Sequence, residues 1–219
     1  MISDNPAPIG GLRRGGRAHS PEQIARIPLV GTWLFIGADF FFLLPLFFAF
    51  FLLQETNNNH MWMPAGVHAP NQALGVTVAV LVVLGILVAR SGLKHLQSQQ
   101  TLARFTSFGR SAAVLFVAAI AVDIWQLSHM GYGISSGAYA SVFFAMWIFM
   151  AIQVAALALW VISLANRAGY ESKHPIAMPG PDAVEEVPTP ISALAHSYGM
   201  FAMFLGSAVL LAWVVTYFL

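Results

Sequence analysis

The sequence predicts an all-α integral membrane protein, a bundle of five transmembrane helices. Composition is the first reason, because 58% of the 219 residues are hydrophobic and only 9% are charged, whereas an ordinary soluble domain has roughly 25% charged residues. The second reason is a set of long apolar runs separated by polar segments. Backbone amides in lipid must form their hydrogen bonds internally, so each of these runs is expected to be a helix.

The apolar runs follow a polar segment, residues 1–28, which we expect to be a loose tail because it has no hydrophobic period. The membrane domain is expected over 29–219. Its first run, 29–53, would make a helix of about 37 Å, enough to cross a hydrocarbon core of about 30 Å with some tilt. The five helices are expected at about 29–53, 73–89, 111–127, 137–165 and 192–219.

The basic residues predict the orientation of these helices. Of the ten Lys and Arg residues, four precede the first helix, four lie between the second and third, and two lie between the fourth and fifth. The positive-inside rule then places the N-terminus in the cytoplasm and the C-terminus outside. A net charge of +1 gives no electrostatic reason to expect nucleic acid as a partner, and the absence of cysteine excludes disulfides and thiolate metal sites.

Two acids inside the expected helices are the main candidates for a functional site. Asp39 lies near the middle of the first helix, and Asp123 lies near the outer end of the third. An ionised acid at a helix centre costs on the order of 3 kcal/mol, so such residues face protein or water. The functional interpretations are proton handling or a polar contact to lipid or a partner subunit. The structural alternative, favoured for Asp123, is an interhelical hydrogen bond worth about 0.6–2 kcal/mol.

The histidines do not predict a haem site, because no two of the seven share one face of a helix at mid-membrane. We therefore expect no cofactor in this chain. A weak copper hypothesis concerns the outer loop after the first helix, where thioether and imidazole groups suit Cu(I). The alternative is an amphipathic loop at the membrane interface, which its tryptophan and proline favour. The weak copper candidates are His60, Met61, Met63 and His68.

The segment Trp33–Phe42, WLFIGADFFF, resembles subunit III of the haem-copper respiratory oxidases. That family opens the corresponding helix with a tryptophan, an aromatic-rich run and an acid six residues after the tryptophan. Trp33 and Asp39 occupy those two places here. The resemblance continues in the outer loop with a tryptophan and a proline, Trp62 and Pro64.

Further along the chain, Val122–Ser135 is similar to the family's helix with two acids three residues apart, followed by a histidine. Asp123 matches the first acid and His129 the histidine, whereas Gln126 replaces the second acid.

The segment Ser136–Val154 resembles the family's Phe-Phe pair and the His-x-x-His pair after it. Phe143 and Phe144 match, and Met150 and Gln153 stand where the two histidines would be.

The resemblance implies a function that composition alone does not. Five helices correspond to the short bacterial form of the family, whose members contain no redox metal, pack against catalytic subunit I, hold phospholipids and support proton uptake. The chain would then be an accessory subunit in the bacterial cytoplasmic membrane, with haem and copper in its partner subunits. The candidate residues for a proton, lipid or subunit-contact site are Trp33, Asp39, Asp123, Gln126 and His129.

Two alternatives remain open. Within the same superfamily, the replaced histidines would suit a subunit III-like companion of nitric oxide reductase. From a different class, two buried acids in a five-helix bundle would suit a small proton-coupled transporter, although Pro45 is the only sign of a broken helix.

Overall fold

The computed structural model describes residues 21–56, 62–93, 99–173 and 191–218. Within these residues the chain forms five α-helices and no strand. All five are long and apolar enough to cross a membrane, which confirms the predicted all-α fold and the multi-pass membrane character of the chain. The helices are α1 (Pro21–Glu55), α2 (Gln72–Leu93), α3 (Gln99–Ser128), α4 (Ala138–Lys173) and α5 (Ile191–Phe218).

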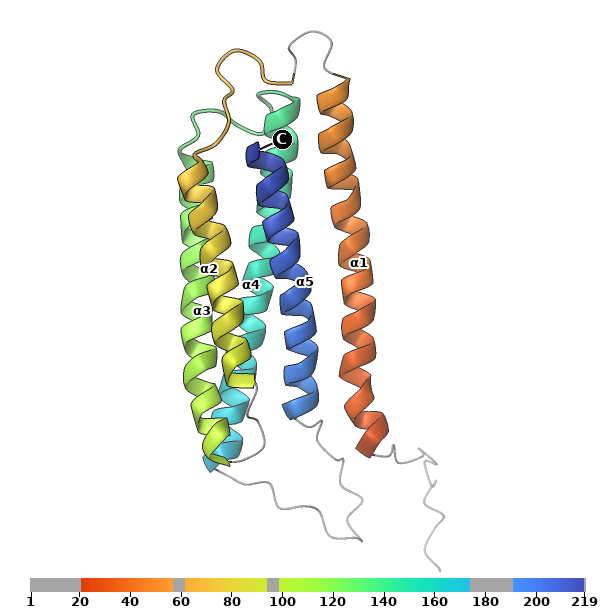
Figure 1. The fold of residues 1–219 in the computed structure, drawn as a ribbon, viewed down its shortest axis with the longest axis vertical. Coiled ribbons are helices and arrows are strands. Elements are labelled where there is room, and N and C mark those ends of the chain that lie inside the picture. The colour runs from red at the N-terminus through yellow and green to blue at the C-terminus, as the bar shows by residue number, and fades with distance from the viewer. Residues whose placement is uncertain (1–20, 57–61, 94–98, 174–190, 219) are drawn as a thin grey trace, which may run out of the picture.

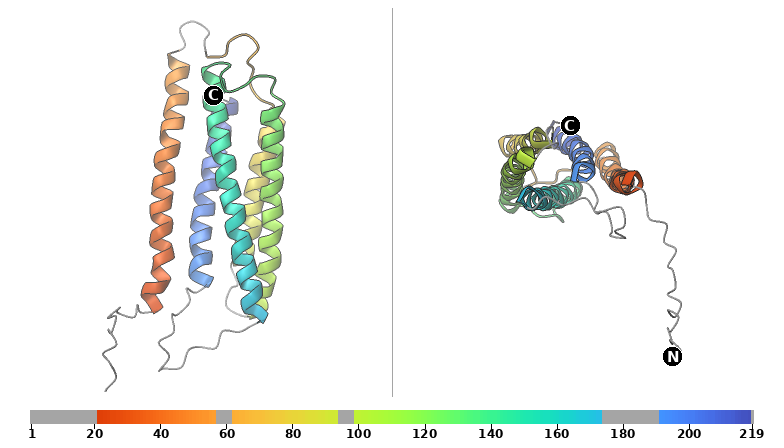
Figure 2. Two further views of the ribbon diagram at one scale, coloured as in Figure 1. Left: turned by 180° about the vertical axis from the view of Figure 1, so that it is seen from behind. Right: turned by 90° about the horizontal axis from the view of Figure 1, so that it is seen from below.

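Helices α2 to α5 form a four-helix bundle, and α1 lies beside it (Figure 1). The end-on view in Figure 2 places α1 outside the ring, where it packs against α4 and α5. Successive helices run in opposite directions, so α1, α3 and α5 begin at the end of the bundle where α2 and α4 finish. The basic residues in the described helices lie in the halves nearer to that end. They are Arg26, Arg90, Arg104, Arg110, Arg167 and Lys173.

A single narrow stripe attaches α1 to the rest of the protein. The buried side chains of this helix, Thr32, Asp39, Leu43 and Phe50, follow one another at intervals of seven, four and seven residues. This is the spacing of a helix seam that faces one partner surface. Most other side chains of α1 are exposed and apolar, which suits contact with lipid. The stripe therefore turns Asp39 towards the bundle.

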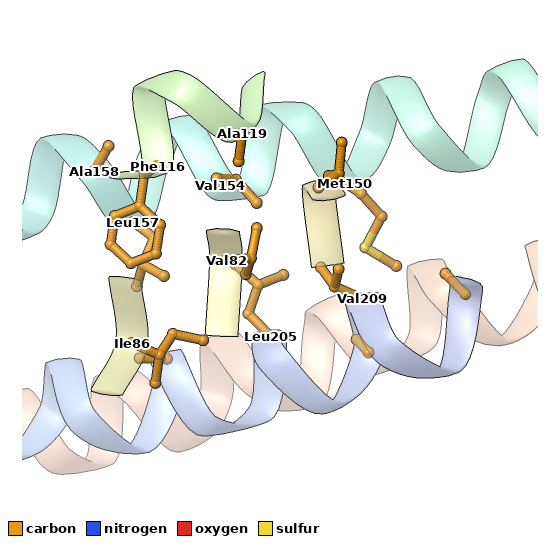
Figure 3. Close-up of a cluster of buried hydrophobic side chains, with 14 of the residues drawn as sticks. Val82, Ile86, Phe116, Ala119, Met150, Val154, Leu157, Ala158, Leu205 and Val209 are labelled. Carbon is orange, nitrogen blue, oxygen red and sulfur yellow. The ribbon is translucent and has the colours of Figure 1, made fainter. Parts of the chain in front are cut away.

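The hydrophobic core lies between α2, α3, α4 and α5. Figure 3 shows Val82, Phe116, Leu157 and Leu205, one from each of these helices, in the same cluster, and each is 0% exposed. Gly85 of α2 gives the Phe116 ring its space, because a Cβ at this glycine would lie 2.6 Å from Phe116 Cε1. Small residues of this kind let membrane helices approach closely without a clash.

Trp62, the first described residue of the segment before α2, packs against the bundle. Its ring is 8% exposed and makes edge contacts with Phe50 of α1 and Tyr139 of α4, with ring centroids 5.1 and 5.4 Å apart. The Trp62 carbonyl also accepts a hydrogen bond of 3.1 Å from the Tyr139 N–H. The end of α1 is thereby tied to the start of α4.

Four helices extend beyond their predicted bounds at the basic end of the bundle, among them α2, which ends at 93 rather than about 89. Helix α1 begins at residue 21 rather than 29, α3 begins at 99 rather than about 111, and α4 ends at 173 rather than about 165. Residues 21–28, predicted as part of the loose tail, are therefore helical. An apolar run marks only the part of a helix inside the hydrocarbon, whereas the backbone hydrogen bonds continue into the more polar surroundings.

Candidate functional site

The carboxyl group of Asp39 meets an amide from α4 inside the membrane-spanning part of the protein. Gln153 Nε2 donates a hydrogen bond of 2.6 Å to Asp39 Oδ1. The two residues are buried, at 4% and 9% exposure. Asp39 lies 16 residues before the end of α1 at Glu55, and Gln153 lies 15 residues after the start of α4 at Ala138. The similar depth of the two residues allows the hydrogen bond to run across the helices.

Aromatic contacts lie on both sides of this carboxyl–amide pair. Four residues before Asp39, Phe35 contacts Phe201 of α5 with ring centroids 5.0 Å apart. Three residues after Asp39, Phe42 stacks on Phe149 of α4 with centroids 6.1 Å apart. Residues at this spacing lie on neighbouring positions of one helix face, so the two ring contacts lie about one turn before and one turn after the pair along α1.

The carboxyl group keeps hydrogen-bonding capacity that the described residues do not use. Asp39 Oδ2 is buried and has no hydrogen-bond partner among them. An ionised acid at a helix centre costs roughly 2.5–3.5 kcal/mol, and one interhelical hydrogen bond returns only about 0.6–2 kcal/mol. The arrangement thus retains a carboxyl group in the membrane that can hold a proton or accept a hydrogen bond from another subunit.

A second polar cluster lies inside the four-helix bundle near the end of α5. Gln126 Nε2 of α3 donates a hydrogen bond of 2.5 Å to the Tyr217 hydroxyl oxygen. From α4, the Tyr139 hydroxyl donates to the Thr216 carbonyl at 3.0 Å, and Trp147 Nε1 donates to the Thr216 hydroxyl at 3.3 Å. These bonds connect α3 and α4 to the last turns of α5.

Asp123 faces the same interior and is 4% exposed, but no hydrogen bond joins it to another described residue. It borders a cavity of about 10 Å³ together with Trp147. The interhelical hydrogen bond expected for this acid is made instead by Gln126, three residues further along α3. The longer side chain of glutamine reaches across to Tyr217, which the short aspartate side chain does not.

Two further candidates contribute no side chain to either polar group, although the His129 N–H donates a hydrogen bond of 3.1 Å to the Gln126 carbonyl. Trp33 is 64% exposed and lines a groove with residues of α2 and α5. His129 follows the end of α3, where its ring stacks on Trp125 with centroids 4.7 Å apart and its Nδ1 lies 2.8 Å from the Trp125 carbonyl oxygen. The His129 imidazole is therefore oriented by Trp125, in the last turn of α3.

The copper hypothesis rests partly on residues outside the described structure, His60 and Met61. Met63 is half-buried against the core, whereas His68 is exposed and its carbonyl oxygen accepts a hydrogen bond of 2.7 Å from the Tyr132 hydroxyl. Among the described residues there is no group of three or more His, Cys, Asp or Glu that could hold a metal ion. The copper site stays a prediction.

Sequence reasoning did not find the partners of the two polar groups. A lone amide in an otherwise apolar helix, at the depth of Asp39, was an available sign that Gln153 could pair with it. Tyr217 gave no comparable sign, because tyrosines near the ends of membrane helices commonly lie at the interface.

The candidate site therefore consists of the carboxyl–amide pair between α1 and α4, with the Gln126 cluster as a second polar group inside the bundle. No protein-family model matches this chain, and no curated protein matches it.

Proposed function

We propose that this chain is an accessory, cofactor-free subunit of a respiratory haem-copper terminal oxidase, similar to subunit III. It lies in the cytoplasmic membrane of a bacterium, with the N-terminus in the cytoplasm and the C-terminus outside. It stabilises catalytic subunit I and supports proton uptake, whereas haem, copper and the reduction of O₂ belong to the partner subunits. Other oxidase subunits and phospholipids surround it.

The hydrogen bond between Gln153 and Asp39 carries this proposal. In the resemblance to subunit III, Asp39 stands at the position of the acid in one helix, and Gln153 stands at the position of the second histidine in another. These positions are 114 residues apart in the chain, and their side chains lie 2.6 Å from each other. The contact between these two positions of the resemblance supports the proposal.

The packing of α1 supports an accessory role. This helix has the smallest buried share of the five. Large apolar side chains cover the rest of its surface, among them Leu34, Phe41 and Phe48, at 71, 72 and 65% exposure. Such a surface suits a neighbouring membrane subunit as well as it suits lipid.

The distribution of basic residues supports the proposed orientation. All six basic residues in the described helices lie towards one end of the bundle, the end at which α1 begins. Arg and Lys near the ends of membrane helices favour the cytoplasmic side, which places the N-terminus there.

The test is purification of the full chain from its native membrane in mild detergent, followed by an optical spectrum and an oxygen-consumption assay. We expect a haem-containing partner to co-elute with the chain. Asp39→Ala should preserve this assembly and lower sustained turnover, and Asp39→Asn, which keeps the shape of the side chain, separates a proton role from a packing role. Elution without haem, or wild-type activity of Asp39→Ala over a long assay, would contradict the proposal.

The same preparation separates the two alternatives. A companion of nitric oxide reductase, which the replacement of both family histidines by Met150 and Gln153 favours, would co-elute with a haem partner that reduces NO rather than O₂. A proton-coupled transporter, which the buried Asp39 and Asp123 would suit, would move protons or solute across liposomes as the isolated chain.

A further inference from the structure

A cavity of about 10 Å³ lies inside the four-helix bundle beside Asp123. Each of α2, α3, α4 and α5 contributes to its lining, and Figure 3 labels several of the lining residues, among them Val82, Ala119 and Met150. These three residues are 0, 1 and 1% exposed. The cavity therefore lies in the core of the bundle rather than on its lipid-facing surface.

The Asp123 carboxyl group faces this cavity with its hydrogen-bonding capacity unused. The carboxyl group is 4% exposed, and no hydrogen bond joins it to another described residue. An ionised carboxyl group accepts hydrogen bonds at both oxygens, and a protonated one also donates a hydrogen bond. Buried polar side chains in proteins nearly always have a partner, which is either protein or an ordered water molecule. In both protonation states Asp123 therefore needs a partner that the described residues do not supply.

The cavity has the size and the second hydrogen-bonding group that one water molecule requires. A volume of roughly 10–15 Å³ is enough for a single water, which needs at least two polar partners. Ala119 lies four residues before Asp123 and lines the same cavity. Its carbonyl oxygen accepts the main-chain hydrogen bond of the next turn and keeps a second lone pair. A water molecule here can donate to this carbonyl oxygen and to the carboxyl group.

Other occupants fit the cavity poorly. A hard cation such as Ca²⁺ or Mg²⁺ takes about six oxygen ligands, whereas Asp123 is the one described lining residue with an oxygen in its side chain. An organic ligand occupies a pocket of roughly 300 Å³ or more. Size and donor set together favour a single small hydrogen-bonding molecule.

We propose that this cavity binds one water molecule, which donates hydrogen bonds to the Asp123 carboxyl group and to the Ala119 carbonyl oxygen. The water takes the place of the partner on another helix that the short side chain of Asp123 does not reach. A hydrogen bond through an ordered water is nearly as favourable as a direct one, so the acid is retained inside the bundle. The site is independent of the proposed oxidase function, because neither Asp39 nor Gln153 lines the cavity.

The test is oxidation by hydroxyl radicals that a brief X-ray pulse generates from water. Such radicals oxidise side chains next to a bound water molecule even where bulk water does not reach. Met150 and Met146 are a matched pair, because both lie in α4 and are 1 and 0% exposed, but Met146 does not line the cavity. In the full chain, purified in detergent with any subunits that accompany it, mass spectrometry should show Met150 oxidised several times faster than Met146. Equal rates would overturn the proposal.

Two variants remove the water in different ways. Asp123→Leu removes the carboxyl group, and Ala151→Val adds methyl groups to the lining; each should lower the oxidation rate of Met150 to that of Met146. Ala155→Val is the matched control, because it adds the same groups one turn further along α4, at a residue that does not line the cavity. Circular dichroism and gel filtration establish that each variant is folded. An unchanged Met150 rate in Asp123→Leu and Ala151→Val, or an equal loss in Ala155→Val, would overturn the proposal.

Discussion

Replacing Gln153 by leucine should weaken the attachment of α1 to the bundle. The substitution keeps a side chain of similar size but removes the only hydrogen bond that Asp39 receives from a described residue. Both oxygens of a carboxyl group that is 4% exposed would then lack a partner. Loss of the bond and the desolvation left behind predict a destabilisation of about 1–3 kcal/mol.

The effect should depend on Asp39. Asp39→Leu removes the carboxyl group and the cost of keeping it in the membrane, so the double variant Asp39→Leu/Gln153→Leu should be close to the wild-type protein in stability. Replacing both partners of a buried hydrogen bond by apolar groups is often nearly neutral. The double variant should therefore be more stable than the sum of the two single effects predicts, by about 1 kcal/mol or more.

The measurement is the free energy of unfolding in mixed micelles of dodecylmaltoside and SDS, followed by circular dichroism. Ile152→Leu is the matched control, because this neighbour of Gln153 is 60% exposed and faces away from the core, so its stability should equal that of the wild type. An unchanged unfolding free energy for Gln153→Leu, or strictly additive effects in the double variant, would refute the reasoning.

Two further predictions concern other parts of the protein. Gly85→Ala places a Cβ 2.6 Å from the buried Phe116 ring and should lower the free energy of unfolding by about 1–3 kcal/mol. Gly37→Ala places a Cβ with nothing within 4 Å and should raise the free energy of unfolding by up to about 1 kcal/mol. Equal effects of the two substitutions in the same SDS titration would contradict the packing described. Burial raises the pKa of Tyr132 from 10.0 to about 12, so its contribution to stability is complete below pH 10 and is lost as the pH rises through about 12. The ultraviolet difference between wild type and Tyr132→Phe should show phenolate absorbance near pH 12, and a midpoint near 10 would show that the Tyr132 hydroxyl is not shielded from water as described.

The five membrane helices could be predicted from the sequence because their cause is local. Each apolar run specifies a helix through its own length and composition, without reference to the other four. The polar ends of α1, α3 and α4 lie outside the apolar runs, so these runs alone did not place them.

The candidate site could be predicted only in part, because its contacts depend on how the helices lie beside one another. The cost of an acid at mid-membrane was enough to single out Asp39, but its partner depends on α1 packing against α4 rather than α2. For the same reason Gln126 rather than Asp123 makes the contact to α5. In the sequence, Arg90 indicated only the orientation of the helices in the membrane. Its place in a groove depends on how α1, α2 and α5 lie beside one another.

The distance in sequence between Asp39 and its partner has a consequence for biogenesis. The ribosome makes α1 first, and the amide that pairs with its acid follows 114 residues later. At a translation rate of about 5–20 residues per second, Asp39 lies in or near the bilayer without its partner for on the order of ten seconds. During this interval a chaperone or insertase would have to shield the acid of this helix from lipid. A chain truncated before α4 would keep Asp39 without its partner, and membrane proteases could recognise that unpaired acid.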